Sequence, residues 1–306
     1  MTPLALIRRP IGHVLGIRRL GGTGYLGDSQ SVRIPFARVV RRCVAGPGLV
    51  PTTRPGDQVL VSVPVYYRTG LGSGYLLIMS SAAHRKFDRL FVEGRRALLT
   101  GTYKVESPPV EGHPRWGIGV VLRPDPVAAH AIEQVAVEAA AVAGGKHWLA
   151  GAVRSSHLTL RRGLEPYRSS VPLGDPCVAR YAAAMRTAVG GVRPLRFAVT
   201  GLTLTPISVM ACAAPTDAGP DNLAKDLTAA LRAEGCGDAG RAPDIWYFNL
   251  VYFTRPVRDP HGLVEWVAAR RITKVTDVLV EDIQLVRWRH VDDGMIPVVL
   301  ASAMSQ

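Results

Sequence analysis

The chain has 306 residues, of which 47% are hydrophobic and 20% are charged, a balance typical of a folded globular protein. It contains no apolar run of about 18 residues, and its first ten residues lack the ordered regions of a secretory signal. We therefore expect a cytoplasmic protein without a membrane span. The formal net charge of +13 excludes an acidic chain and favours an anionic partner.

The first 78 residues differ in composition from the rest. They hold ten arginines, no lysine and two acids, whereas the remainder holds 27 bases and 22 acids. The segment 21–27, GGTGYLG, has the G-x-G-x-x-G spacing of dinucleotide-binding loops. Arginines precede it, Pro35 interrupts the segment after it, and no acid lies about 20 residues on. We interpret it as a flexible turn, and expect one or two short strands in 55–68.

A different pattern begins at Met79. A serine there is placed to cap a helix that carries apolar residues at Phe87, Leu90 and Phe91. We expect residues 1–78 to be a basic appendage, or an extension upstream of a natural start at Met79. Residues 79–306 are then one domain.

From Trp116 the elements alternate regularly. Strands are predicted at 116–124 and 147–162, with a helix at 126–144 between them. A helix at 180–191 and a strand at 194–206 come next. The series then repeats, with a strand at 208–215, a helix at 221–235, a strand at 245–253, a helix at 262–272, and strands at 278–288 and 295–302.

The two series share the order strand, proline, acid, helix, strand, and Pro124 and Pro215 are 91 positions apart. This period is too long for a solenoid and indicates two related lobes. The fold class predicted is α+β, with two pseudo-symmetric lobes of mainly antiparallel sheet backed by helices. A cleft separates the lobes.

The segment 155–162, SSHLTLRR, carries the chemistry. Alternation along a strand places His157 and Thr159 on one face, and Arg161 continues that face. A shift of 91 or 92 positions brings this motif onto residues 247–253, so that His157 corresponds to Asn249 and Thr159 to Val251. Imidazole, hydroxyl and guanidinium groups together can transfer a proton and bind phosphate.

The HLTL motif, the segment TGLTLTP at 200–206 and the duplicated order resemble the two-histidine (2H) phosphoesterase superfamily, which includes 2′-5′ RNA ligase-like proteins and cyclic phosphodiesterases. The resemblance covers residues 115–302. It implies two facing H-x-T or H-x-S motifs, one histidine taking a proton and the other giving one, without a metal or another cofactor. It also implies a phosphodiester or nucleotide ligand, including RNA ends.

The second motif departs from that pattern. Asn249 cannot titrate and Val251 has no hydroxyl, and losing one acid or base costs about 10²–10⁴ in rate. Three alternatives therefore stay open: a phosphodiesterase, a pseudoenzyme that binds the ligand without turnover, or an enzyme of different chemistry on the same fold. The sequence does not indicate the oligomeric state.

The expected site derives from these assignments. His157, Thr159 and Asn249 are the candidate catalytic residues. The candidate ligand-binding residues are the basic and aromatic side chains near the two motifs, together with the second-motif valine: Arg154, Arg161, Tyr167, Arg168, Tyr247 and Val251. The four cysteines lack metal-ligand spacing, and no metal site is expected.

Overall fold

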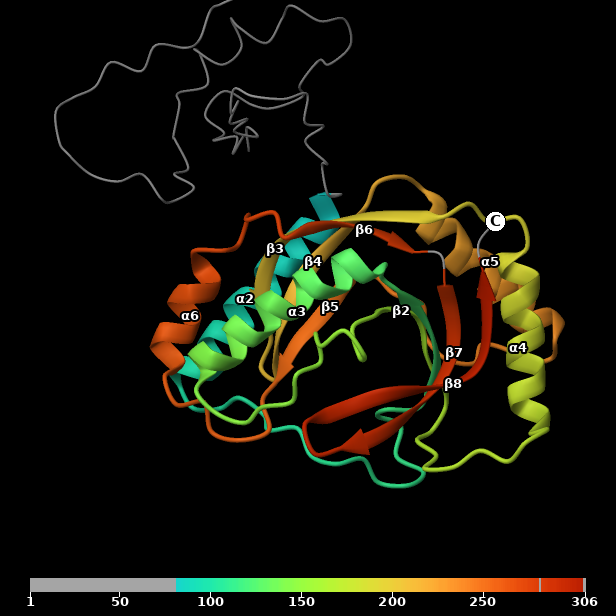
Figure 1. Ribbon diagram of the computed structural model, residues 1–306, viewed down its shortest axis with the longest axis horizontal. Helices are drawn as coiled ribbons and strands as arrows, with labels where there is room; N and C mark the ends of the chain where they lie inside the picture. Colours follow the sequence, from blue (N-terminus) through green and yellow to red (C-terminus); the bar gives the residue numbers. More distant parts are fainter. Residues whose placement is uncertain (1–80, 281, 305–306) are drawn as a thin grey trace, which may run out of the picture. The chain divides into compact units, whose positions relative to one another are not determined.

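The computed structural model describes residues 81–280 and 282–304. The segments 21–27 and 55–68, for which a turn and strands are predicted, lie outside the described residues. Five helices and eight strands alternate along the described part of the chain (Figure 1): α2 (Ser81–Leu99), β1 (Ile118–Arg123), α3 (Pro126–Ala143), β2 (Leu158–Glu165), α4 (Pro176–Val189), β3 (Leu195–Leu204), β4 (Ser208–Pro215), α5 (Gly219–Ala233), β5 (Trp246–Tyr252), α6 (Pro260–Ala268), β6 (Thr276–Val280), β7 (Asp282–Val291) and β8 (Gly294–Met304).

The strands form two antiparallel four-stranded sheets, which confirms the α+β class. One sheet has the order β2-β1-β7-β8 and the other β5-β4-β3-β6. Helices α2, α3 and α6 pack against the second sheet. Helix α4 packs on β7 and β8, and α5 packs on α4.

The duplication is visible in the strand order. The first half contributes the neighbours β1 and β2 to one sheet, and the second half contributes β4 and β5 to the other. The third strand of the first half, β3, pairs with β4, while β7 of the second half pairs with β1. Each half therefore completes the sheet of the other, and the two lobes are interleaved.

Three helices begin in the same way, with an aspartate followed by proline. Asp125 accepts a hydrogen bond from the backbone N–H of Ala128 at 3.0 Å. Asp175 does the same for α4 and Asp259 for α6. Proline fits the first helical position because its missing N–H would have no partner there. The helix α3 therefore starts at Pro126 as predicted, whereas the helices predicted at 180–191 and 262–272 start earlier, at Pro176 and Pro260.

One large apolar core cluster joins the two sheets. On α3, Ile132 and Ala139 have no exposed surface. They belong to the same core cluster as Leu158 of β2 and Leu250 of β5. Because β2 and β5 are the edge strands that carry the two motifs, this shared core fixes the motifs relative to each other.

Two predicted strands are wrong in extent. The strand expected at 147–162 is β2 alone, because residues 149–155 form turns in which Ser155 and Ser156 donate backbone hydrogen bonds to Ala152. The strand expected at 278–288 is divided between β6, which pairs with β3, and β7, which pairs with β1. The chain changes sheets between Val280 and Asp282.

Candidate active site

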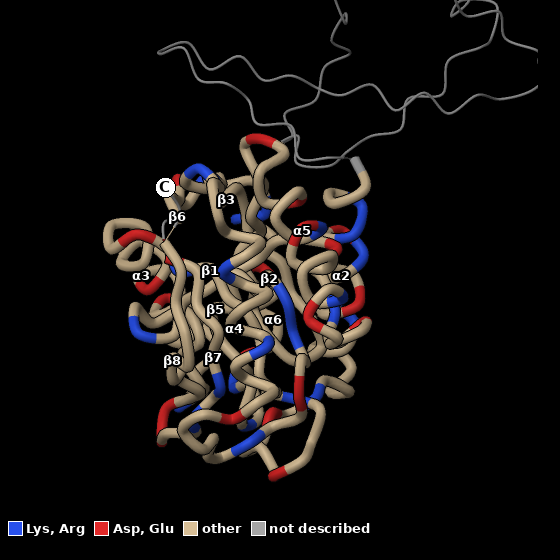
Figure 2. The backbone as a smooth tube through the Cα atoms, turned by 90° about the vertical axis from the view of Figure 1, so that its right-hand side faces the viewer, with Lys and Arg blue, Asp and Glu red and all other residues tan. Residues whose placement is uncertain are grey.

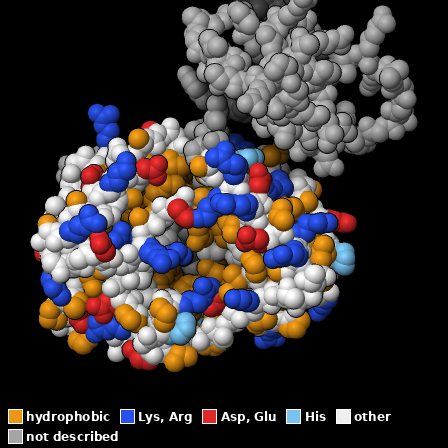
Figure 3. Space-filling model, turned by 180° about the vertical axis from the view of Figure 1, so that it is seen from behind, with side chains coloured by type: hydrophobic (Ala, Val, Ile, Leu, Met, Phe, Trp, Pro, Cys, Tyr) orange, Lys and Arg blue, Asp and Glu red, His pale blue; other side chains and the backbone are white. Residues whose placement is uncertain are grey.

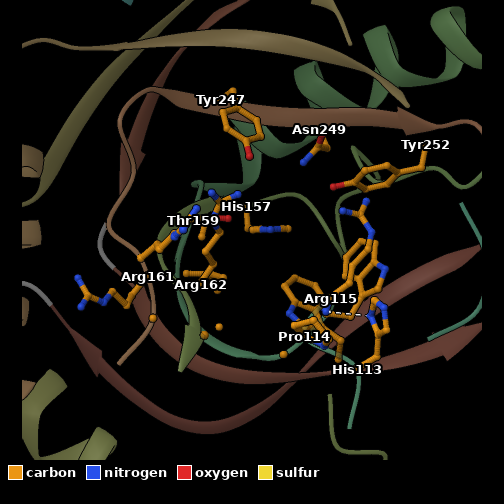
Figure 4. A pocket seen from close by; sticks show the side chains of 18 residues that line it. His113, Pro114, Arg115, His157, Thr159, Arg161, Arg162, Tyr247, Asn249 and Tyr252 are labelled. Atoms are coloured by element: carbon orange, nitrogen blue, oxygen red, sulfur yellow. Dashed lines mark hydrogen bonds between the residues drawn. The ribbon is translucent and has the colours of Figure 1, made fainter. Parts of the chain in front are cut away.

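A pocket of about 620 Å³ lies between the two edge strands (Figure 4). It is lined by His157, which directly precedes β2, by Thr159 of β2, and by Tyr247 and Asn249 of β5. In Figure 4 these side chains extend into the same space from different strands. The two motif segments therefore contribute to one cavity.

The pocket is basic. It is lined by two histidines, His113 and His157, and by the four arginines Arg115, Arg161, Arg162 and Arg241. None of its described lining residues is an aspartate or a glutamate. On the molecular face in Figure 3, by contrast, basic and acidic side chains are interspersed. Guanidinium groups in a concave site without carboxylates favour an anionic ligand.

The tautomer of His157 follows from its hydrogen bond. Its Nδ1 lies 2.7 Å from the carbonyl oxygen of Ser155, which can only accept, so Nδ1 carries the proton. Burial lowers the pKa of His157 to about 4, the hydrogen bond to Ser155 opposes this shift, and the nearby Arg123 cation adds to it. The imidazole is neutral at pH 7, and its Nε2 has an available lone pair.

The strand β2 contains a β-bulge beside the first motif. Thr159 pairs with Val121 of β1, and Arg161 pairs with the preceding residue, Val120. The strand β2 thus advances two residues where β1 advances one, and Leu160 is the extra residue. Leu160 and Arg161 are consecutive buried residues as a result.

The strand β5 contains a bulge at the corresponding place. Asn249 pairs with Met210 of β4, and Val251 pairs with Val209. Leu250 is the extra residue here, and both Leu250 and Val251 are fully buried in the core. Counted from the two bulges, the motif segments are related by an offset of 90 rather than 91 or 92.

This register corrects the correspondence made from the sequence. Thr159 corresponds to Asn249, because each is the last paired residue before its bulge. His157 therefore corresponds to Tyr247, and H-L-T-L at 157–160 matches Y-F-N-L at 247–250. A phenol, rather than an amide, therefore stands at the position that corresponds to His157.

Val251 is not on the pocket lining, since it has no exposed surface and lies in the core. Phe253, which alternation also places on the Asn249 face, is buried in the same way. Alternation fails because the extra residue in a bulge reverses the facing of the residues after it. Tyr252 lines the pocket instead.

Three other expected ligand-binding residues lie outside the lining. Arg154 forms an ion pair with Asp293. Arg168 forms ion pairs with Asp175 at 2.7 Å and with Glu165 at 3.6 Å. The third, Tyr167, is buried in a small cluster with Trp148, Val286 and Trp288. These ion pairs and this packing give the three residues structural roles outside the pocket.

Arg161 reaches the lining, but its guanidinium is occupied. Its Nε donates to the carbonyl oxygen of Ala239 at 2.8 Å, and its Nη1 donates to Oγ1 of Thr228 at 3.1 Å. Burial lowers its pKa, opposed by the Asp238 carboxylate. The side chain therefore joins β2 to α5 and the loop after it.

Aromatic residues that the sequence did not single out form one wall of the pocket. The ring of Trp116 contacts those of Tyr252 and Trp288 edge-on, with centroids 5.3 and 5.5 Å away. Trp116 has a backbone φ of 63°, in the left-handed region that non-glycine residues seldom adopt. Its Nε1 donates to Glu106 at 3.2 Å.

The same carboxylate holds a pocket arginine. Glu106 is 6% exposed and accepts two hydrogen bonds from Arg115, one of them from Nε at 2.6 Å. The Arg115 guanidinium carbon lies 5.6 Å from the ring centroid of Tyr252. In the sequence, the only sign of this cluster is the neighbouring arginine and tryptophan in the segment P-R-W-G at 114–117, just before β1. The fold brings it beside the motifs.

The part of the chain that the structure describes contains no group of three or more histidine, cysteine, aspartate or glutamate side chains placed to hold a metal ion. No helix there is long and apolar enough to cross a membrane.

The chain is similar in backbone arrangement to several solved structures. The TT0787 protein of Thermus thermophilus is 17% identical, with a TM-score of 0.44 over 61% of this chain and 96% of that one. LigT of E. coli complexed with 3′-AMP is 13% identical, with a TM-score of 0.41 over 62% and 97%. A structure described as a phosphoesterase is 15% identical, with a TM-score of 0.38 over 62% and 98%. No protein-family model and no curated protein matches the chain.

Proposed function

We propose that this pocket binds a phosphodiester ligand and hydrolyses a 2′,3′-cyclic phosphate end, as a diverged relative of the 2H phosphoesterases. The supporting observation is that His157, directly before the edge strand β2, and Tyr247, on the edge strand β5, line one basic pocket whose described lining has no carboxylate. The ligand's negative charge matches the arginines of the lining. An RNA end is the natural source of such a group.

His157 is the general base in this proposal. Its Nε2 is unprotonated, because Nδ1 carries the proton donated to Ser155 and the ring is neutral at pH 7. A water molecule gives its proton to Nε2 as its oxygen attacks phosphorus. The new P–O bond forms while the bond to one ribose oxygen breaks.

Tyr247 is the general acid. Its hydroxyl gives a proton to the departing ribose oxygen, completing the transfer that an asparagine cannot make. Thr159 and Asn249 occupy equivalent positions on β2 and β5, and each donates a hydrogen bond to a phosphate oxygen. Each half then supplies one proton-transfer group and one phosphate-binding group.

The aromatic wall binds the base of the nucleotide. Tyr252 and Trp288 both line the pocket, and Trp116 braces them through its edge-on contacts. Stacking of a base on an aromatic side chain contributes about 1–3 kcal/mol and tolerates any base. We therefore expect weak base preference.

Hydrolysis of uridine 2′,3′-cyclic phosphate by the full chain tests the proposal. Tyr247→Phe removes only the hydroxyl, so kcat should fall by about 10²–10⁴ while binding of the deoxydinucleotide TpT stays within about twofold. His157→Ala should lower kcat by at least as much. His130→Ala, on the exposed face of α3, is the control and should leave both values unchanged.

A second candidate is binding without turnover. It is favoured by one observation, that the register-equivalent position of His157 holds no second imidazole. TpT binding without any hydrolysis by the wild-type chain would support this candidate and eliminate the catalytic roles. Absence of both TpT binding and hydrolysis would eliminate the phosphodiester proposal itself.

A further inference from the structure

The four pocket arginines differ in whether their guanidinium groups have partners. Arg115 is paired with Glu106, and Arg161 donates to Ala239 and Thr228. Within the described residues, the side chains of Arg162 and Arg241 form no hydrogen bond or ion pair. These two guanidinium groups are free to bind an anion.

The backbone holds the two unpaired arginines together. The N–H of Arg162 donates to the carbonyl oxygen of Arg241 at 3.1 Å, and the N–H of Arg241 donates back at 2.8 Å. Two reciprocal hydrogen bonds fix this pair in the middle of β2. Like charges that are held side by side repel each other, and a bound anion relieves that repulsion.

A small groove continues from the main pocket at this point. Thr159, Arg162, Arg241 and Tyr247 line both cavities. The groove is otherwise lined by Ala242, Pro243, Asp244 and Ile245. The two cavities therefore adjoin each other at Thr159, Arg162, Arg241 and Tyr247.

Helix α2 adds positive charge beside the groove. Lys86 of α2 forms an ion pair with Asp244 at the groove's edge. Burial lowers the pKa of Lys86, and the positive charges of Arg89 and Arg162 lower it further. The two arginines are therefore close enough to Lys86 to repel its positive charge. Figure 2 shows Lys and Arg positions along α2. Asp244 is the only carboxylate among the described residues that line the groove.

We infer that Arg162, Arg241 and Lys86 form a second anion subsite, which holds a phosphate adjacent to the one bound between β2 and β5. The inference rests on the proposed function and narrows its ligand: the chain binds an oligonucleotide end with at least two phosphates, in preference to a mononucleotide. Tyr247, which lines both cavities, is placed to stack against the base between the two phosphates.

Calorimetric binding of three deoxydinucleotides to the full chain tests this. TpT carries one phosphodiester, and pTpT and TpTp add a terminal phosphate at the 5′ or the 3′ end. One of these two dinucleotides places its terminal phosphate in the groove. It should bind about tenfold more tightly than TpT, because the added phosphate forms charge-assisted hydrogen bonds there. Its affinity should also depend more steeply on salt, with a logarithmic slope larger by about 0.7.

Two substitutions move this affinity ratio in opposite directions. The ratio is the dissociation constant of TpT divided by that of the tighter-binding phosphorylated form. Arg241→Ala should reduce this ratio to about one. Asp244→Asn removes a competing negative charge and releases Lys86, so the ratio should rise, a gain that misfolding cannot produce. Arg95→Ala is the control, because it lies on α2 about 14 Å along the axis from Lys86 and should leave the ratio unchanged.

A ratio near one for both phosphorylated forms in the wild-type chain would overturn the inference while leaving the proposed function intact, provided that TpT binds. An unchanged ratio in both Arg241→Ala and Asp244→Asn would overturn it as well. Failure of TpT to bind at all would instead remove the phosphodiester proposal on which it rests.

Discussion

The imidazole of His157 is held between a carbonyl oxygen and an aromatic ring. Nδ1 donates to Ser155, and the ring centroid lies 4.8 Å from that of Trp288. Arg123, which donates to the carbonyl oxygens of Ser156 and Val153, places a cation behind the same turn. Burial and the Arg123 cation disfavour a second proton on the ring, and this keeps the base form available at neutral pH.

This environment predicts a pH dependence of stability. The pKa of His157 is about 4 in the folded chain and about 6.5 when unfolded. Between these values the unfolded state binds more protons, so the free energy of unfolding should decrease as pH falls from about 6.5 to about 4. Above pH 6.5 the residue contributes no slope. Urea unfolding of wild type and His157→Gln at pH 7, 5.5 and 4.5 measures the difference.

The stability difference between the two proteins should be largest at pH 7, in favour of wild type, and should shrink on acidification. The exposed His130, replaced by glutamine, serves as the control. A difference between wild type and His157→Gln that stays constant over this range would contradict the prediction, because it would mean that His157 titrates alike in both states.

At the scale of elements, the start of α3 at Pro126 agrees with the prediction, whereas the helix predicted from residue 180 starts at Pro176. The aspartate–proline cap and the apolar periodicity of α3 are both visible in the sequence, because caps and periodicity depend on neighbouring residues. Five of the expected site residues, which lie in or directly beside β2 and β5, line the pocket: His157, Thr159, Arg161, Tyr247 and Asn249.

The correspondence between the halves was not predictable in the same way. Which residue of β5 is extra depends on its pairing with β4, and Met210 and Val209 show no signal for it in the sequence. Alternation therefore assigned Val251 to the pocket and overlooked Tyr252. The Glu106–Arg115–Trp116 cluster was missed because only the folded chain brings these residues to the motif strands.

The bulge in β5 predicts different effects for two residues that lie close together in the sequence. Val251→Thr buries a hydroxyl in the core and should lower the free energy of unfolding by about 1–3 kcal/mol without changing TpT affinity. Asn249→Ala should weaken TpT binding several-fold with a much smaller effect on stability. Chemical denaturation and calorimetry of both variants provide the measurements.

The two substitutions serve as controls for each other, because Leu250 separates them and both lie on β5. If Val251→Thr weakened TpT binding while leaving stability unchanged, Val251 would face the ligand and the bulge would be placed wrongly.

At the scale of the molecule, the exchange of β3 and β7 makes the duplicated halves inseparable. In the described part of the chain, β3 pairs with β4 and β6, both from the second half. The core cluster likewise draws on both sheets. The two halves therefore form one folding unit, and residues from both halves line the pocket.

This arrangement predicts how the chain can be divided. A fragment of residues 79–306 contains every element of the two sheets and the core, so it should unfold in a single cooperative transition and bind TpT with the affinity of the full chain. A fragment of residues 79–206 ends after β3 and lacks both strands that pair with it, so it should remain unfolded, although it retains His157 and Thr159. Circular dichroism with thermal melting and calorimetry distinguish these outcomes. Cooperative folding of the shorter fragment would show that the halves are independent domains, and loss of TpT binding in the longer one would assign part of the site to residues 1–78.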